Sequence, residues 1–302
     1  MPERNDTQSI DSIPGICEIT RHGDFVSGRG FLIELPHGAT RGVHFEALRG
    51  RLRDDYPDDL EQFFFVNTDV GGPECADEIA RRLARRGHGV LVVRCLLPRT
   101  FVDCNRVVGN GLRGEGMTPP VPWFVKDEVD IALLLSMYDR YQALARRCYQ
   151  SVCGAGGRGL ILHTYAPRSV DIDRIDDDIV LRLREAYEPG RFERWPLRPA
   201  VDIISENTAG RLLAAEISVE TLEREYAAID IAAALNATYR LHPETQGFVH
   251  SERHPGQLLC IEIRRDLLAE PFDPFREMHI APANVARMCG PIVTALRAGA
   301  PC

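Results

Sequence analysis

The chain has 302 residues, of which 44% are hydrophobic, and it carries a formal net charge of −8. This length and composition allow a large core, whereas the acidic balance repels phosphate backbones, so we expect no nucleic-acid partner. No apolar run is long enough to span a membrane, and the polar N-terminus lacks the apolar stretch of a signal peptide, so we expect a cytoplasmic protein without membrane contact.

Apolar runs alternate along the chain with segments of helical periodicity. The predicted strands cover residues 30–35, 63–66, 89–93, 159–164, 199–204, 246–250 and 257–263. The predicted helices cover residues 73–83, 126–148, 208–217, 219–236 and 284–298. Between them, residues 107–124 are rich in Gly and Pro and predict a long, functional loop.

This alternation, with several strands as continuous apolar runs, indicates an α/β fold with a mixed, mostly parallel sheet flanked by helices on both faces. No linker divides the chain. We therefore predict a flexible N-terminal tail over residues 1–14 and one α/β domain over residues 15–302. The nine cysteines are scattered and include no Cys-x-x-Cys pair, so a zinc site built from thiolates is not expected.

Three polar side chains follow apolar runs, at the points where predicted strands end. They are His37, Asp69 and His163. Ligand sites of such sheets lie at the carboxyl ends of the strands, and two imidazoles with one carboxylate are a common ligand set for catalytic zinc. A single histidine in this position is more often structural, and only the joint placement of the three favours a metal site.

Glu262 lies within the apolar run 258–263, where a carboxylate is costly to bury without a partner or a role. It could serve as a general base, or it could face outward from an edge strand. Asn105 and Arg106 form a second polar pair. The planar guanidinium of an arginine can bind a carboxylate through two nitrogens, although a surface arginine beside a turn has the same sequence pattern.

Together these residues resemble the N-formylglutamate amidohydrolase family, which is distantly related to the zinc carboxypeptidases. The resemblance extends from about residue 30 to residue 298. The matching segments, in order, are Pro36–Thr40, Asn67–Asp69, Val102–Arg106, Tyr141–Ala145, Ile161–Thr164, Gly247–His254 and Ile261–Asp266. Each segment is short, and their order and spacing carry the resemblance.

The resemblance implies a phosphorylase/hydrolase-like, zinc carboxypeptidase-like fold and a bound zinc ion held by His37, Asp69 and His163. The carboxypeptidase pattern His-x-x-Glu is absent, because Thr40 is the third residue after His37, so Asp69 is the predicted carboxylate ligand and Glu46 the alternative. Glu262 is implied as the general base that acts on a zinc-activated water molecule.

The same resemblance implies the residues that contact substrate. Asn105 and Arg106 would bind a substrate carboxylate, and Asp103 would orient Arg106. Arg253 would hold a second carboxylate or the oxyanion. Thr164 and His250 are further predicted substrate contacts.

Several positions depart from the usual residues of the family, and they predict a changed substrate because they surround the proposed ligands. These positions are Gly38, Asn67, Gln142, Ile161 and Thr164. Our leading hypothesis is a zinc-dependent amidohydrolase acting on a small N-formyl or N-acyl amino acid or a related carboxylate-bearing amide. The alternatives are a carboxypeptidase-like or deacylase enzyme acting on a peptide or biosynthetic intermediate, and a non-catalytic binding protein. The sequence leaves the oligomeric state open.

Overall fold

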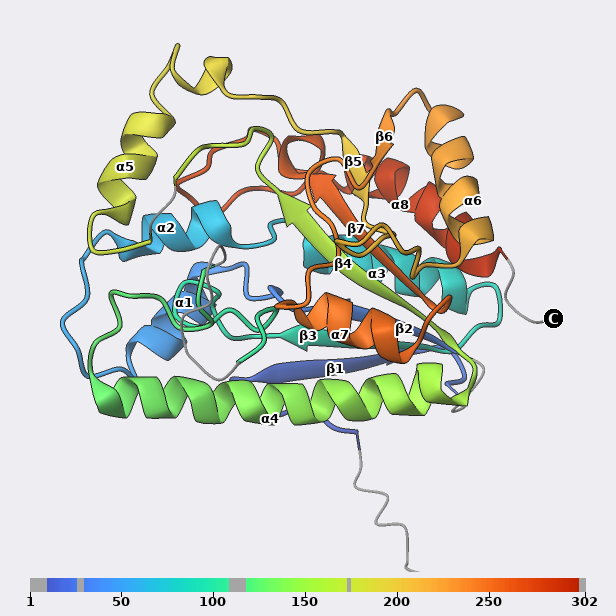
Figure 1. Cartoon of the computed structure of the whole chain (residues 1–302), viewed down its shortest axis with the longest axis horizontal. Coiled ribbons are helices and arrows are strands. Elements are labelled where there is room, and N and C mark those ends of the chain that lie inside the picture. Colours follow the sequence, from blue (N-terminus) through green and yellow to red (C-terminus); the bar gives the residue numbers. More distant parts are fainter. Residues whose placement is uncertain (1–9, 26–29, 109–117, 173–174, 299–302) are drawn as a thin grey trace, which may run out of the picture.

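The computed structural model describes residues 10–25, 30–108, 118–172 and 175–298, and most of residues 1–14, the predicted tail, lies outside these ranges. One seven-stranded sheet runs through it (Figure 1) in the order β1-β3-β2-β4-β7-β5-β6. The strands are β1 (Cys17–His22), β2 (Phe31–Leu35), β3 (Val90–Cys95), β4 (Arg158–Tyr165), β5 (Val201–Ile203), β6 (Ala233–Leu235) and β7 (Leu258–Arg264).

Strands β3, β2, β4 and β7 are parallel neighbours in the middle of the sheet. The outer strand β1 is antiparallel to β3, and β5 is antiparallel to β7 and parallel to β6. The predicted mixed, mostly parallel sheet is therefore confirmed. The parallel arrangement brings the carboxyl ends of β2, β4 and β7 side by side, which is where parallel sheets place their ligand sites.

Helices cover both faces of the sheet. They are α1 (Gly42–Arg49), α2 (Leu60–Asn67), α3 (Gly72–Ala84), α4 (Glu128–Val152), α5 (Ile179–Ala186), α6 (Glu216–Ala227), α7 (Gln246–Arg253) and α8 (Pro282–Arg297). Successive residues of the central strands alternate between two apolar cores, since side chains of a strand point to opposite faces. One core contains α3, α6 and α8, and the other contains α1, α2, α4 and α5.

The apolar run 63–66 is helical, so the predicted strand there is wrong. It lies within α2, where Phe63, Phe64 and Phe65 are all buried. A short run of this kind is apolar all round whether it is a buried strand or a buried helix, and periodicity alone does not separate the two. Asp69 consequently follows a helix rather than a strand.

The predicted strand 246–250 is also wrong, because these residues form the first part of α7. Thr245 caps this helix, and its hydroxyl oxygen accepts a hydrogen bond from the amide of Phe248 at 3.2 Å. Of the predicted helix 208–217, only residues 216–217 are helical, as the start of α6; residues 208–211 form a turn in which the side-chain oxygen of Asn207 accepts hydrogen bonds from two nearby amides. The predicted helix 219–236 ends at Ala227, before β6.

The other predicted strands and helices are present with shifted ends. Of the predicted loop 107–124, residues 109–117 lie outside the described ranges, and the described remainder forms neither helix nor strand. Among the described residues, no helix is both long enough and apolar enough to cross a membrane.

Candidate metal centre

His37, Asp69 and His163 come together at the carboxyl edge of the sheet. His37 lies two residues beyond β2, His163 lies near the end of the neighbouring strand β4, and Asp69 lies in the turn between α2 and α3. One ligand atom from each residue lies within 4.8 Å of the others. All three side chains are buried, with exposed fractions of 2%, 2% and 4%.

Hydrogen bonds determine which imidazole atoms face the shared space. His37 donates through Nε2 to Oδ1 of Asp103 at 2.7 Å, because a carboxylate can only accept. Its Nδ1 lies 3.4 Å from Oδ2 of Asp69 and has no hydrogen-bond partner among the described residues. Nδ1 of His163 lies 2.9 Å from the same Oδ2 atom.

These three residues fit a metal ion. Ligand atoms of a tetrahedral zinc site with bonds of about 2.0–2.1 Å lie about 3.3 Å apart, close to the separations of the two Nδ1 atoms from Asp69. The buried, unpartnered Nδ1 of His37 is the kind of atom that a metal would satisfy. Hydrogen bonding of the distal Nε2 to a carboxylate is the usual way in which a ligand histidine is held in its tautomer.

The charges around this group keep its carboxylates ionised. Burial alone would raise the pKa of Asp69, but His37 and His163 hold that pKa well below its ordinary value. Burial likewise opposes ionisation of Asp103, yet Arg99, Arg106 and His37 keep its pKa well below the usual range. Both carboxylates are therefore available as anions. Asp69 lies between the two histidines, and Asp103 lies behind His37.

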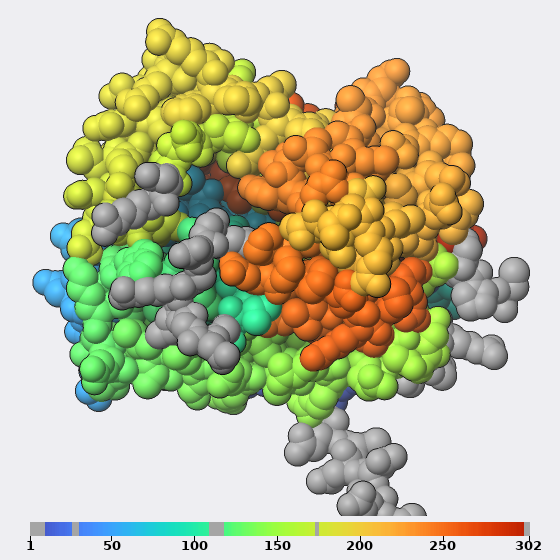
Figure 2. Space-filling view, viewed as in Figure 1, coloured from blue at the N-terminus to red at the C-terminus, as the bar shows by residue number. Residues whose placement is uncertain are grey.

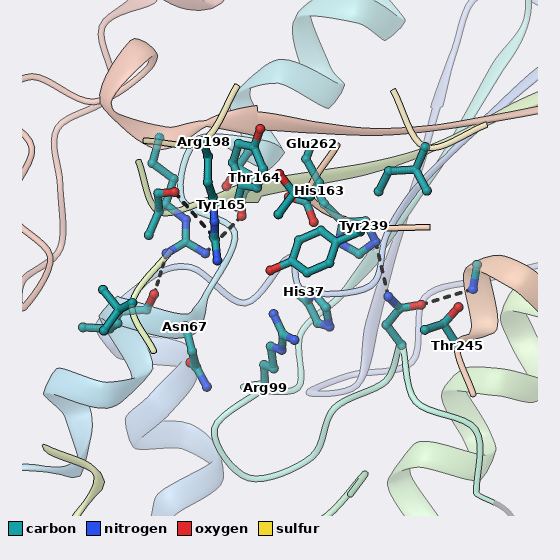
Figure 3. A pocket seen from close by; sticks show the side chains of 18 of the residues that line it. His37, Asn67, Arg99, His163, Thr164, Tyr165, Arg198, Tyr239, Thr245 and Glu262 are labelled. Atoms are coloured by element: carbon teal, nitrogen blue, oxygen red, sulfur yellow. Dashed lines mark hydrogen bonds between the residues drawn. The ribbon is translucent and has the colours of Figure 1, made fainter. Parts of the chain in front are cut away.

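Glu262 lies in β7 directly opposite His163 of β4 in the strand register. Its Oε2 atom is buried and has no hydrogen-bond partner among the described residues. Burial and the nearby Asp69 raise the pKa of Glu262 to about 7, against the opposing effect of His163, Arg198 and Arg265. Figure 3 shows Glu262 next to His163, on the same side of the pocket.

A pocket of about 460 Å³ opens over His37, His163 and Glu262. Figure 2 shows a hollow between the yellow segment that carries α5 and the orange segments nearby. Asn105, Arg106 and Thr164, three of the predicted substrate contacts, line this pocket. The Nδ2 atom of Asn105 lies 3.5 Å from Nε2 of His163, while the hydroxyl of Thr164 donates to the carbonyl of Val70 at 2.9 Å.

Arg253 and His250 do not reach this pocket. Both belong to α7 and line a separate hollow together with Tyr149 and His254. His250 is buried, and its ring stacks on that of Tyr149 with centroids 3.8 Å apart. Residues 246–253 are helical, whereas the sequence predicted a strand over residues 246–250. Glu46, the alternative ligand, is exposed on α1 and does not belong to the candidate metal group.

The pocket also contains residues that the sequence analysis missed. Arg99 donates from Nε to Oδ2 of Asp103 at 3.0 Å. Asp103 therefore contacts both Arg99 and His37, in addition to its predicted role of orienting Arg106. Arg106 lies farther from Asp103, with its Nη1 atom 3.8 Å from Oδ2. Arg198 and Tyr239 lie over the pocket (Figure 3), with the guanidinium 5.7 Å from the ring centroid. The sequence signal for Arg99 was its place four residues before Asp103.

No protein-family model matches the chain, and no curated protein matches its sequence. Solved structures do match. An N-formylglutamate amidohydrolase from Ralstonia eutropha JMP134 is 17% identical, with 92% of this chain and 95% of that chain covered and a TM-score of 0.54. A gene product from Agrobacterium tumefaciens is 16% identical, with coverages of 95% and 96% and a TM-score of 0.49. A succinylglutamate desuccinalase from Vibrio parahaemolyticus is 12% identical, with coverages of 92% and 61% and a TM-score of 0.44. The first of these likenesses bears out the fold that the sequence resemblance implied.

Proposed function

We propose that the chain is a zinc-dependent amidohydrolase that cleaves the amide of a small N-acyl amino acid or a related carboxylate-bearing amide. The observation that carries this proposal is the buried group of His37, Asp69 and His163 with the unpartnered carboxylate of Glu262 beside it. The fold shared with the Ralstonia N-formylglutamate amidohydrolase supports it.

His37, Asp69 and His163 would hold the metal, and zinc suits two imidazoles with one carboxylate. When bound, zinc supplies a Lewis acid that polarises a carbonyl group and lowers the pKa of water. Asp103 holds Nε2 of His37 protonated, which keeps Nδ1 free to act as the ligand atom. Arg99 in turn holds Asp103 in place.

Glu262 is the proposed general base. Glu262 lines the pocket and is opposite His163 in the strand register, and its buried Oε2 atom has no hydrogen-bond partner among the described residues. It takes a proton from the water molecule whose oxygen attacks the amide carbon, and it passes this proton to the leaving nitrogen as the C–N bond breaks. The products are a carboxylate and a free amine, so protons and electrons balance without a further reactant.

The substrate carboxylate has a binding site on the side of the pocket formed by residues 99–106. Arg106 is mostly buried, and its Nε atom lacks a hydrogen-bond partner among the described residues. Arg99 and Asn105 line the same side. Because a guanidinium is planar and always charged, Arg106 can hold a carboxylate in a fixed orientation.

The position of Glu262 weighs against the alternative of a non-catalytic binding protein. A scaffold that has lost its reaction has no need to retain a carboxylate with a buried, unpartnered oxygen such as Oε2 of Glu262, because such an atom costs stability. The carboxypeptidase-like alternative differs in the substrate alone, and a substrate screen separates it from the main proposal.

Elemental analysis of the purified protein, combined with a hydrolysis screen, tests the proposal. We expect close to one zinc ion per chain and release of free amino acid from N-acyl amino acids. Blocked peptides serve as the second substrate class, and cleavage of these alone would favour the carboxypeptidase-like alternative. A protein that binds zinc neither as purified nor after addition of the metal would contradict the proposal.

A further inference from the structure

One side of the pocket is apolar. Its residues come from α2, from α5 and from the segments on either side of α5. They are Phe63, Val66, Val170, Ile172, Ile175, Ile179, Leu183 and Tyr187. Helices α2 and α5 lie near one another on the same side of the sheet (Figure 1), and a hydrogen bond from Arg184 to Gln62 links them. We call this set the apolar wall.

Three of the arginines that line the pocket donate hydrogen bonds to the protein itself. Arg168 donates to the carbonyl of Trp195 at 2.6 Å, and Arg198 donates to the hydroxyl of Ser169 at 3.0 Å. Arg265 is buried and donates to the carbonyl oxygens of Val66 and Thr164. These hydrogen bonds hold the three guanidinium groups to the surrounding chain, and the side chains of the apolar wall themselves carry no charge.

The polar and apolar sides of the pocket differ in origin. Arg99, Asn105 and Arg106 come from the segment after β3, whereas the apolar wall comes from α2 and the chain around α5. His37, His163 and Glu262 line the same pocket as both sides. A substrate with its carboxylate at the arginines and its amide at Glu262 can therefore extend its acyl group along the apolar wall.

We propose that the acyl group of the substrate is an extended apolar chain of about four or more carbons, rather than a formyl or a dicarboxylic acyl group. This inference rests on the proposed function and names its substrate class. A formyl group has no carbon to place against the wall. A succinyl group would bring a carboxylate to a surface of uncharged, mostly apolar side chains, where its loss of hydration is costly.

Burial of apolar surface makes the expected effect measurable. Each methylene that leaves water adds up to about fourfold in affinity, and somewhat less where the fit is imperfect. Lengthening the acyl group from formyl to octanoyl is therefore expected to raise affinity by at least about tenfold, and by much more if the whole chain is enclosed.

Binding and hydrolysis of four N-acylglutamates test the inference. The acyl groups are formyl, succinyl, pentanoyl and octanoyl, of which succinyl and pentanoyl are nearly equal in length but differ in charge. Binding is measured by titration calorimetry on the zinc-loaded Glu262→Gln variant, and kcat/KM is measured on the unaltered enzyme. We expect octanoyl and pentanoyl to bind more tightly than formyl, and succinyl at least about tenfold more weakly than pentanoyl.

Variants of the wall show whether the apolar side chains cause this preference. Ile175→Asn should reduce octanoyl binding about tenfold and leave formyl binding nearly unchanged. Val170→Phe fills part of the pocket without adding a polar group. It should also weaken the binding of octanoylglutamate more than the binding of pentanoylglutamate. Leu181→Asn is the matched control, because Leu181 lies on α5 but is 56% exposed and does not line the pocket.

The outcomes separate this inference from the proposed function. The inference would be overturned if the formyl or succinyl compound is hydrolysed fastest and the octanoyl compound binds no more tightly than these two. The amidohydrolase proposal would then remain intact. Tight octanoyl binding without hydrolysis of any N-acyl amino acid would support the apolar acyl site and overturn the proposed reaction. Failure of all four compounds to bind would overturn the inference as well.

Discussion

His37 donates from Nε2 to Oδ1 of Asp103 at 2.7 Å, and its other ring nitrogen, Nδ1, lies 3.4 Å from Oδ2 of Asp69. A carboxylate behind a ligand histidine sets its tautomer and raises its basicity. The Asp103→Asn variant keeps the size of the side chain but can present an amide donor instead of an acceptor. We expect its affinity for zinc to fall by about 10- to 100-fold, measured by competition with a chelator. Asp266→Asn, at an ion pair with Arg264, is the control and should bind zinc as the unaltered protein does.

Metal removal should lower thermal stability. A ligand that binds only the folded state stabilises it by about 1.4 kcal/mol for each tenfold excess over its dissociation constant. We expect Tm to fall when a chelator strips the protein and to recover with added zinc, with a rise that grows with zinc concentration. Magnesium prefers oxygen ligands and should not restore Tm. A Tm that does not change with zinc concentration would contradict the assignment of His37, Asp69 and His163 as ligands.

Glu262→Gln should separate catalysis from metal binding. The amide cannot accept a proton from water, so we expect kcat to fall by about 10²- to 10⁴-fold. Zinc content should stay unchanged, because Glu262 lies outside the candidate metal group. Glu252→Gln on α7 removes a surface carboxylate that pairs with Arg211 and should leave both quantities unchanged. Loss of zinc from Glu262→Gln would instead identify Glu262 as a ligand.

Arg106→Gln should weaken substrate binding more than it slows the chemical step. A lost charged hydrogen bond costs about 1.5–3 kcal/mol, which corresponds to a rise in KM of about 10- to 100-fold. If the carboxylate is bound equally in ground and transition states, kcat changes little. Arg81→Gln on α3, where the side chain is 49% exposed, is the control. A large drop in kcat at unchanged KM would place Arg106 at the reacting atoms.

The candidate metal residues can be predicted from the sequence because their positions depend on where apolar runs end, which is visible without a structure. His37 follows β2, and His163 lies near the end of the neighbouring parallel strand β4. Asp69 was placed correctly for a wrong reason, since the run before it is the helix α2. The end of a buried helix and the end of a buried strand both lead the chain out of the core, so the polar residue that follows lies at the same edge.

Arg253 and His250 could not be placed in this way. Their distance from the pocket depends on whether residues 246–253 form a helix or a strand. The helix is stabilised by the cap at Thr245 and by the packing of His250 on Tyr149. The contact with Tyr149 spans about a hundred residues of chain, so no local pattern reveals it. Arg99 was missed for the opposite reason. Its bond to Asp103 is local, but it matters only because Asp103 contacts His37.

Asp130, near the start of α4, should make stability depend on pH. Its buried carboxylate accepts hydrogen bonds from the amides of Arg53 and Asp54 and from the hydroxyl of Tyr56, at 2.9–3.0 Å. Burial would raise the pKa of Asp130, but these hydrogen bonds hold it below its ordinary value. A lowered folded pKa stabilises the protein above the unfolded value of about 3.9, and this stabilisation is lost as the pH falls through the folded value.

Asp130→Asn should therefore lower the free energy of unfolding by about 2–3 kcal/mol at pH 7, because charged hydrogen bonds to three donors are weakened. Below about pH 4 the difference from the unaltered protein should shrink, since the carboxyl group there becomes neutral as well. Urea unfolding at pH 7 and at pH 3.5 measures both quantities. Asp139→Asn, exposed on the same helix, should show neither effect. A destabilisation that is equal at both pH values would mean that the shape of the side chain, and not its charge, holds the segment from Arg53 to Tyr56 against α4.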